Sequence, residues 1–196
     1  MEQIKPVENV EQKTKMQSFW ELVRFALIAL VIVIPVRLFI AEPFVVSGTS
    51  MVPTFQNGDY LIVDKISYEL GSPQRGDVVV FRYPKNPSQF FIKRVIGLPG
   101  ETVDVKSAEN IVTITNAQHP EGFNLDESFV KNVGGIDDHI VLGADEYFVM
   151  GDNRIASSDS RYWGPVAKNF FVGKVFSRLL PITNIDLWPG SIKETQ

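Results

Sequence analysis

Residues 75–100 read RGDVVVFRYPKNPSQFFIKRVIGLPG, and this stretch holds the two clearest strand signals in the sequence. The apolar run Val78–Phe81 follows a Gly-Asp pair, and the run Phe90–Ile96 ends at the turn-like segment Gly97–Gly100. Short runs of β-branched and aromatic residues between glycine and proline are typical of β-strands. We therefore expect two strands here, within a β-rich domain.

Further strand signals lie on both sides of this stretch. They fall at residues 60–63, 102–105, 111–115 and 147–150. The second and third of these runs are close enough to form a hairpin. Strands of this length and spacing predict an all-β barrel or sandwich over residues 42–196, with the more polar residues 116–145 as a small insertion. Val172–Leu180 fits either a strand or a short helix, because its periodicity does not decide between them.

Upstream of this domain, residues Phe25–Val36 form a run of twelve without a charge. A bilayer core of roughly 30 Å requires about 20 helical residues, a length that Leu22–Ala41 supplies. We therefore expect a transmembrane anchor over residues 19–41, preceded by a polar tail at residues 1–18. Two alternatives stay open. The run could be the core helix of a soluble protein or a cleaved signal peptide, although Ala41–Pro43 is a poor cleavage site.

The distribution of basic residues predicts the orientation of this anchor. Four Lys or Arg residues precede the apolar run, whereas after Arg37 the next basic residue is Lys65. Basic residues near a membrane span favour the cytoplasmic side. The expected protein is therefore a single-pass protein of the cell membrane, with a cytoplasmic tail and an extracytoplasmic domain at residues 42–196.

Composition excludes several classes of function. The formal net charge is −4, which disfavours binding of nucleic acid over a broad surface. The absence of cysteine excludes disulfide frameworks, Cys-based metal sites and Cys nucleophiles. The two histidines, His119 and His139, lie in polar stretches and do not suggest a metal site or a catalytic triad. We expect no cofactor and no metal.

One lysine stands out because it lies in the middle of an apolar run. Lys93 alternates with Phe91 and Val95 on one face of its predicted strand. An edge-strand lysine that blunts aggregation is the ordinary interpretation. The alternative is a desolvated amine with a depressed pKa, which can take a proton from a serine hydroxyl. The segment Ser47–Thr54 offers such hydroxyls, although an ordinary Ser/Thr turn explains it as well.

The chain resembles the bacterial type I signal peptidases, through ordered blocks that cover residues 20–181. These blocks are Ser47–Thr54, Gly58–Lys65, Arg75–Pro84, Ile92–Glu101, and Gly151–Arg154 with Ser157–Gly164. The apolar anchor lies immediately upstream, as it does in that family. The resemblance implies a signal-peptidase-type β-domain behind one membrane helix.

The resemblance also implies roles for individual residues. Ser50 matches the nucleophile of the family and Lys93 matches its general base. Asp159 and Arg161 match the acidic residue and the arginine that support the site. Ser157 matches a serine that, in relatives, can hydrogen-bond and orient the lysine amine.

Three further positions qualify this match. Gly151 and the turn that follows it should lie close to the active site. Gly48 stands two residues before the nucleophile, where some relatives have an oxyanion-hole serine, and Ser47 is one place too early for that role. Ile155 replaces a polar residue that many relatives have. We therefore expect the oxyanion hole to rely on the backbone N–H of Ser50 and on a second donor that the sequence does not identify.

The function implied is that of a membrane-anchored serine endopeptidase, which cleaves signal peptides with a small-x-small motif from exported preproteins. Its expected partners are these preproteins and the lipid bilayer, without nucleic acid, and the expected state is a monomer. Candidate substrate-binding edges are Phe44–Val46 and the strand that leads into Lys93. Met51, Val52 and Phe55 either dip into the membrane interface or pack in the core.

Two other classes of function remain as alternatives. A soluble self-cleaving regulator of the phage-repressor type also uses a Ser-Lys pair, but it needs a DNA-binding domain in place of the anchor. A non-enzymatic, membrane-anchored scaffold or receptor predicts instead that replacing Ser50 or Lys93 leaves the function intact.

Overall fold

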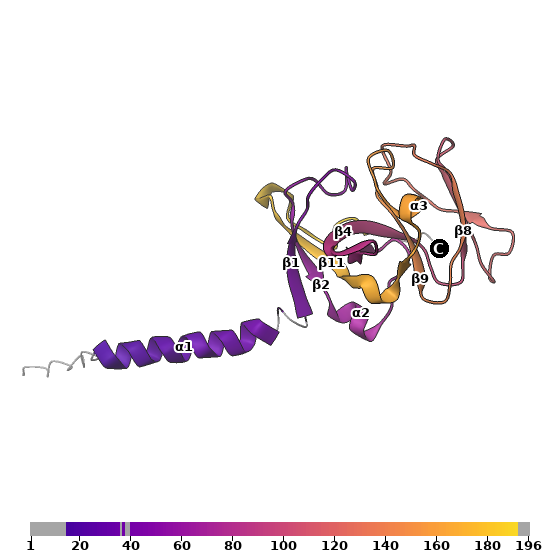
Figure 1. The fold of residues 1–196 in the computed structure, drawn as a ribbon. Coiled ribbons are helices and arrows are strands. Elements are labelled where there is room, and N and C mark those ends of the chain that lie inside the picture. Colours follow the sequence, from indigo (N-terminus) through magenta and orange to yellow (C-terminus); the bar gives the residue numbers. More distant parts are fainter. Residues whose placement is uncertain (1–14, 36, 38–39, 192–196) are drawn as a thin grey trace, which may run out of the picture. The chain divides into compact units, whose positions relative to one another are not determined.

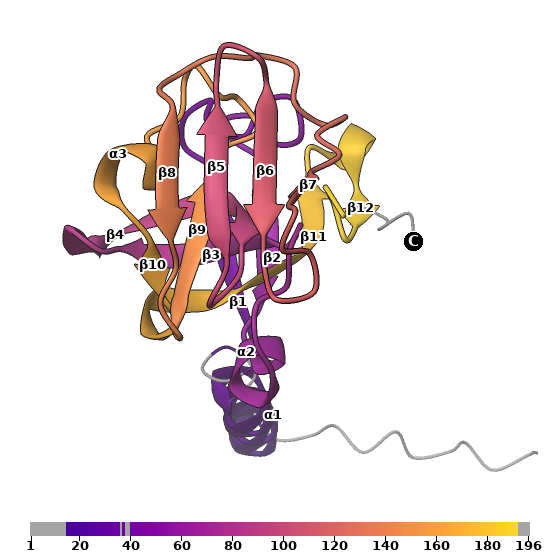
Figure 2. The ribbon, with the colours of Figure 1, turned by 90° about the vertical axis from the view of Figure 1, so that its right-hand side faces the viewer.

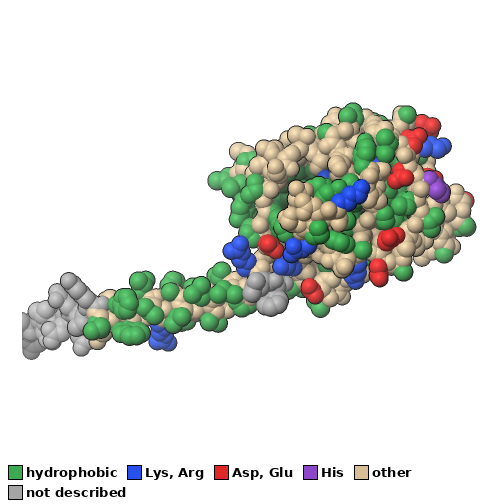
Figure 3. Space-filling view, in the orientation of Figure 1, with side chains coloured by type: hydrophobic (Ala, Val, Ile, Leu, Met, Phe, Trp, Pro, Cys, Tyr) green, Lys and Arg blue, Asp and Glu red, His purple; other side chains and the backbone are tan. Residues whose placement is uncertain are grey.

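The computed structural model describes residues 15–35, 37 and 40–191, and it divides the chain into two compact units, Met1–Leu38 and Phe39–Gln196 (Figure 1). The first unit contains one helix, α1, at Lys15–Pro35. Within α1, Met16–Pro35 is long and apolar enough to cross a membrane, with a mean hydropathy of 2.0. Hydrophobic side chains cover most of its visible face (Figure 3).

The bounds of α1 differ from those expected for the anchor, residues 19–41. The helix begins at Lys15, so residues 15–18 belong to it, whereas the rest of the expected tail, residues 1–14, lies outside the described residues. The α-helix ends at Pro35, and Ala41 is already the first residue of a strand. Proline disrupts the interior of a helix, which fits an end at this position.

The second unit is built mainly of strands, which confirms the mostly-β fold class. Its larger sheet has the order β1-β2-β11-β3-β4-β9-β10, with β12 paired to β11. These strands are β1 Ala41–Val45, β2 Tyr60–Asp64, β3 Val78–Tyr83, β4 Asn86–Gly97, β9 Glu146–Met150, β10 Val166–Ala167, β11 Phe171–Leu180 and β12 Asp186–Leu187. All of these strand pairs are antiparallel.

A smaller antiparallel sheet has the order β7-β6-β5-β8 (Figure 2). Its strands are β5 Thr102–Lys106, β6 Ile111–Thr115, β7 Phe123–Asn124 and β8 Asp138–Val141. The expected hairpin over residues 102–115 is confirmed by the β5–β6 pairing. Residues 116–145, expected as an insertion, supply the two outer strands of this sheet, β7 and β8.

Within residues 41–191 the second unit also has four short helical segments. They are α2 Ile66–Leu70, α3 Ser160–Trp163, and the 3₁₀ turns η2 Lys168–Phe170 and η3 Ile182–Asn184. The segment at residues 172–180 proves to be a strand, because β11 pairs with β2 on one side and with β3 on the other.

The core of the second unit settles one alternative about the residues after Ser50. Met51 is 1% exposed and Phe55 is fully buried, and both pack in one hydrophobic cluster with Leu61 and Val175. These two side chains are therefore core residues, and the interpretation that they dip into a membrane interface is wrong. Val52 is half-buried.

The order of the larger sheet positions the predicted site. The loop after β1 carries Ser50, the central strand β4 carries Lys93, and the turn after β9 begins with Gly151. Lys93 pairs with Val79 of β3, and the next residue, Arg94, pairs with Met150 of β9. The site therefore forms where three segments from distant parts of the sequence converge.

Candidate active site

The loop that carries Ser50 is closed by its own backbone. The N–H of Val46 donates to the carbonyl of Asp59 over 2.9 Å, and the N–H of Gly58 donates back to Val46 over 2.8 Å. Inside this closure, the N–H of Gly48 donates to the side chain of Asn57 over 2.9 Å. Gly48 has a φ of 98°, a conformation that glycine adopts without the steric cost of a side chain. Glycine at this position therefore suits the shape of the loop.

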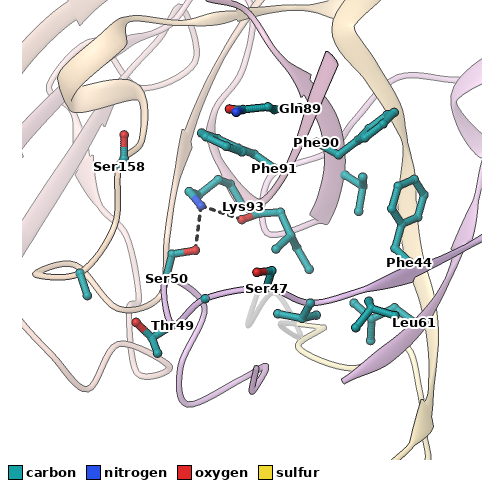
Figure 4. Close-up of a pocket in the computed structure, with 16 residues that line it drawn as sticks. Phe44, Ser47, Thr49, Ser50, Leu61, Gln89, Phe90, Phe91, Lys93 and Ser158 are labelled. Carbon is teal, nitrogen blue, oxygen red and sulfur yellow. Dashed lines mark hydrogen bonds between the residues drawn. The ribbon is translucent and has the colours of Figure 1, made fainter. Parts of the chain in front are cut away.

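Lys93 contacts Ser50 directly. Its Nζ lies 2.8 Å from Ser50 Oγ and 2.9 Å from the carbonyl oxygen of Ile92 (Figure 4). Lys93 is only 4% exposed, and β4 lies between β3 and β9. The edge-strand interpretation of this lysine is therefore wrong, and the alternative of a desolvated amine fits.

Burial dominates the electrostatics of this amine. Loss of solvent lowers the pKa of Lys93 to about 8, because the charged ammonium form is poorly solvated there. The carboxylates of Asp159 and Asp152 act in the opposite direction and limit the fall in pKa. With a pKa near 8, about a tenth of the amine is neutral at pH 7, which is enough for it to act as a base.

Asp159 and Arg161 form a fully buried, two-pronged ion pair. Arg161 Nε lies 2.8 Å from Asp159 Oδ1, and its Nη2 lies 2.9 Å from Oδ2. Asp159 also accepts a 3.1 Å hydrogen bond from the N–H of Gly151, while Arg161 donates to the carbonyls of Gly134 and Arg154. The pair therefore joins the turn after β9 to the polypeptide around it.

Gly151 lies so close to the loop that carries Ser50 that no side chain fits there. A Cβ on Gly151 would overlap the carbonyl oxygen of Ser50 and the Oγ of Ser157. Two residues further on, the N–H of Asn153 donates to the Ser50 carbonyl over 2.9 Å, and its Nδ2 donates to the Thr49 carbonyl over 3.1 Å. The turn that begins at Gly151 therefore lies beside Ser50.

Ser157 differs from its expected contact. The residue is 4% exposed and adjoins Gly151, but its Oγ has no hydrogen-bond partner within the described part of the chain. The second hydrogen bond of the Lys93 amine goes instead to the carbonyl of Ile92. The expected hydrogen bond between Ser157 and the lysine amine is thus not formed in this structure.

A second buried ion pair adjoins the site and was not foreseen from the sequence. Arg94 Nε lies 2.8 Å from Asp152 Oδ1, and its Nη2 lies 2.6 Å from Oδ2. Thr54 Oγ1 donates to the same carboxylate over 2.5 Å. A signal was available, because Arg94 follows Lys93 in an apolar run and Asp152 follows Gly151 in a motif block.

An open cleft of about 640 Å³ runs past the Ser50–Lys93 pair. One wall comes from residues 44–50 and the other from residues 89–93. Phe44, Leu61 and Phe90 lie in the apolar part of the cleft, away from the polar Ser50–Lys93 pair (Figure 4). One side of this groove is the end of β1 and the loop after it, and the other side is β4. Such a groove suits an extended peptide with apolar or small side chains.

Other catalytic arrangements find little support. In the ranges 15–35, 37 and 40–191, no group of three or more His, Cys, Asp or Glu residues is placed to hold a metal ion. The side chains of His119 and His139 are 51% and 65% exposed and contact Glu121 and Asp104. Neither histidine lines the cleft.

Known proteins that are similar to this chain in sequence also point to a peptidase. The sequence profile of the family described as signal peptidase, peptidase S26, matches residues 19–180. A probable signal peptidase I-2 of Synechocystis sp. is 35% identical and covers 92% of this chain and 85% of its own. A signal peptidase I of Leptolyngbya laminosa is 36% identical, and the match covers 81% of this chain and 78% of that protein. The protein in a crystal structure of a signal peptidase I from Enterococcus faecalis V583 is 32% identical in sequence. The structural match has a TM-score of 0.43 and covers 53% of this chain and 96% of that one. This chain therefore belongs to the signal peptidase family, peptidase S26.

Proposed function

We propose that this protein is a membrane-anchored serine endopeptidase that removes N-terminal signal peptides from exported preproteins, with Ser50 as nucleophile and Lys93 as general base. The observation that carries the proposal is the 2.8 Å hydrogen bond between a buried lysine amine and a serine hydroxyl at the edge of an open cleft. Ser-Lys pairs catalyse acyl transfer without histidine.

The chemistry follows from this pair. Neutral Lys93 takes the proton of Ser50 as its Oγ attacks the carbonyl carbon of the scissile bond. Lys93 then gives the proton to the leaving amine, and an acyl-enzyme on Ser50 remains. In the second half-reaction Lys93 takes a proton from the water that attacks the ester, and it returns this proton to Ser50 Oγ as the acyl group leaves. The backbone N–H of Ser50 is our candidate donor to the oxyanion, since Gly48 has no side chain to offer.

The neighbouring residues act by holding this pair in place. Asp159 and Arg161 fix the turn that begins at Gly151, and that turn contacts the Ser50 carbonyl. Ser157 Oγ lies beside the same glycine with its hydrogen-bonding capacity unused by the described residues. We assign these four residues supporting roles, without direct contact with the reacting bond.

The substrate is expected to lie extended between the walls at residues 44–50 and 89–93. Main-chain hydrogen bonds to a strand edge bind an extended peptide whatever its sequence. Side-chain selection then falls to the cleft, whose apolar lining suits the small residues that precede a signal-peptide cleavage site.

Location in the cell follows from α1 and from the charge distribution. We infer that α1 anchors the protein in the cell membrane, that the residues before it are cytoplasmic, and that residues 42–196 form the extracytoplasmic catalytic domain. Four basic residues before the apolar run support this orientation. We propose that the protein acts as a monomer in contact with the lipid bilayer.

The test is cleavage of a purified preprotein with an Ala-x-Ala site by the full chain in detergent. The wild type is expected to release the mature protein, whereas Ser50→Ala and Lys93→Met should not. Lys168→Met is a matched control, because this lysine hydrogen-bonds to Ser72 and does not line the cleft. Cleavage by Ser50→Ala or Lys93→Met at the wild-type rate would overturn the assignment and favour a scaffold or receptor.

A further inference from the structure

The last described residues of the chain, 188–191, form a strap that closes over the guanidinium of Arg94. The carbonyl oxygen of Gly190 lies 2.5 Å from Arg94 Nη1, which also donates to the carbonyl of Gly76 over 2.9 Å. The family profile ends at residue 180, so the strap lies beyond the matched region. Its role therefore has to be judged from its own contacts.

The strap is anchored to β11 at its first residue and is closed by a turn of its own. The N–H of Trp188 donates to the Phe176 carbonyl over 2.8 Å, and the two rings meet edge to face at 4.9 Å. The N–H of Ser191 donates to the Trp188 carbonyl over 3.1 Å, which closes the turn. Between them Pro189 is buried, so the anchored Trp188, the buried Pro189 and the turn together direct the carbonyl of Gly190 at Arg94.

Arg94 in turn connects the segments that form the active site. It is fully buried and follows Lys93 on β4. Its Nε and Nη2 donate to the two carboxylate oxygens of Asp152, the residue after Gly151. The same carboxylate accepts a hydrogen bond from Thr54, four residues after the nucleophile. A buried guanidinium needs an acceptor for each of its donors, and the strap supplies one of them.

We propose that the C-terminal strap is a positioning element of the active site: the carbonyl of Gly190 fixes Arg94, and through Asp152 it holds the Ser50 loop against the strand that carries Lys93. The proposal rests on the proposed function of the Ser50–Lys93 pair. No residue of the strap lines the substrate cleft, so its effect should fall on the chemical step and not on substrate binding.

The test uses Gly190→Ala in the full chain. Gly190 has a φ of 74°, and a Cβ there would lie 2.6 Å from Thr54 Cγ2 and 3.3 Å from Arg94 Nη2. The substitution should therefore push the strap away from Arg94. We expect kcat to fall about tenfold, with KM within about twofold of the wild type, because reacting groups are displaced while the cleft is intact.

Two further readouts separate positioning from a general loss of folded protein. The charged groups that act on Lys93 are Asp152, paired with Arg94, and Asp159, paired with Arg161. A loosened Arg94 leaves Asp152 less neutralised, which favours the ammonium form of Lys93. The midpoint of the rising limb of kcat/KM against pH should then move up by about half a pH unit. A reduced folded fraction would leave that midpoint unchanged.

The second readout is rescue. Thr54→Ser removes the methyl group that the new Cβ would strike but keeps the hydroxyl that binds Asp152. The double variant Gly190→Ala, Thr54→Ser should recover part of the lost kcat and move the midpoint back toward the wild-type value, while the strain of alanine at a φ of 74° remains. A chain that stops after Leu187 should resemble Gly190→Ala, whereas a chain that stops after Ser191 should resemble the wild type.

The outcomes are distinct. Wild-type kcat and midpoint in Gly190→Ala and in the chain ending at Leu187 would overturn the proposal while leaving the proposed function intact. A fall in kcat with an unmoved midpoint and no rescue would overturn it as well. If neither variant unfolds cooperatively, the strap is a folding element and the proposal fails. If the wild type does not cleave the preprotein, the proposed function fails and the positioning role fails with it.

Discussion

Lys93 carries its amine on a strand with neighbours on both sides, where two oxygen atoms, Ser50 Oγ and the Ile92 carbonyl, accept its hydrogen bonds. Its pKa of about 8 sets the pH range in which the amine can act as a base. A neutral amine is needed for proton transfer, so the rate should depend on how much of Lys93 has lost its proton.

The first prediction concerns this pH dependence. The rising limb of kcat/KM should have its midpoint near 8, well below the 10.5 of an ordinary lysine, because burial lowers the pKa of Lys93. Lys93→Arg should be inactive at every pH, since a guanidinium stays protonated. Initial rates of peptide cleavage from pH 6 to 11 measure both. A midpoint near 10.5 would contradict the desolvated base.

The second prediction concerns stability. The pKa of Lys93 is lower in the folded protein than in the unfolded chain, so protonation favours unfolding below pH 8 and this cost disappears as the pH rises through 10.5. Lys93→Met should therefore raise the free energy of unfolding by about 2 kcal/mol at pH 7. Urea titrations at pH 7 and 10.5 should show that gain shrinking. A destabilised variant at pH 7 would refute this interpretation.

The third prediction concerns Gly151. Gly151→Ala places a methyl group against the Ser50 carbonyl and Ser157, so the nucleophile must move and kcat should fall by about 10². Gly143→Ala is the control, because Gly143, like Gly151, is not in a left-handed conformation, and a new Cβ there meets only the flexible side chain of Glu146. The kcat of each variant for cleavage of a preprotein, compared with the wild type, tests this prediction. Equal activity in the two variants would argue against a close packing role for Gly151.

At the residue scale, the sequence alone located the two proposed reacting groups but not all of their surroundings. Ser50 and Lys93 stand in motif blocks, and the structure brings them to hydrogen-bonding distance. The Arg94–Asp152 pair was missed because its members lie in different blocks, and only the packing of β4 against β9 brings them together. The unused Oγ of Ser157 likewise depends on side-chain orientation, which motif spacing does not encode.

Among the elements, strands with strong local signals were predictable and the one without them was not. The runs at 60–63, 78–81 and 90–96 all lie in strands. The segment at 172–180 has no decisive periodicity, and its strand state comes from pairing on both sides with β2 and β3. The role of residues 116–145 was also hidden, because β7 and β8 are short edge strands whose pairing is set by β5 and β6.

The fourth prediction concerns α1. Unit Phe39–Gln196 has hydrophobic clusters of its own and contains the whole Ser50–Lys93 site, so it should fold without the helix. A chain of residues 39–196 should be recovered without membranes and should cleave a short soluble peptide with kcat within about tenfold of the full chain. A protein that fails to unfold cooperatively, or that has lost peptide cleavage, would show that α1 contributes to the catalytic unit.

For the molecule as a whole, orientation in the membrane is the main prediction. The natural chain lacks cysteine, so single cysteines can report on each side. Cysteine in place of Lys106, an exposed residue of β5, should react with a membrane-impermeant maleimide added to intact cells. Cysteine in place of Lys5 should react only after lysis, as the basic residues before the apolar run imply. The reverse labelling pattern would invert the proposed topology.

The place of β11 in the larger sheet has a consequence for how the enzyme comes into being. The strands on either side of Ser50, β1 and β2, are separated in the sheet from β3 and from β4, which carries Lys93, by β11 at residues 171–180, a strand that is translated after all four of them. Until that strand has been synthesised and inserted, no sheet pairing joins the strands beside Ser50 to the strand that carries Lys93. A growing chain thus cannot assemble the Ser50–Lys93 site before β11 is in place, so we expect peptide cleavage to appear only after residue 180 has been translated.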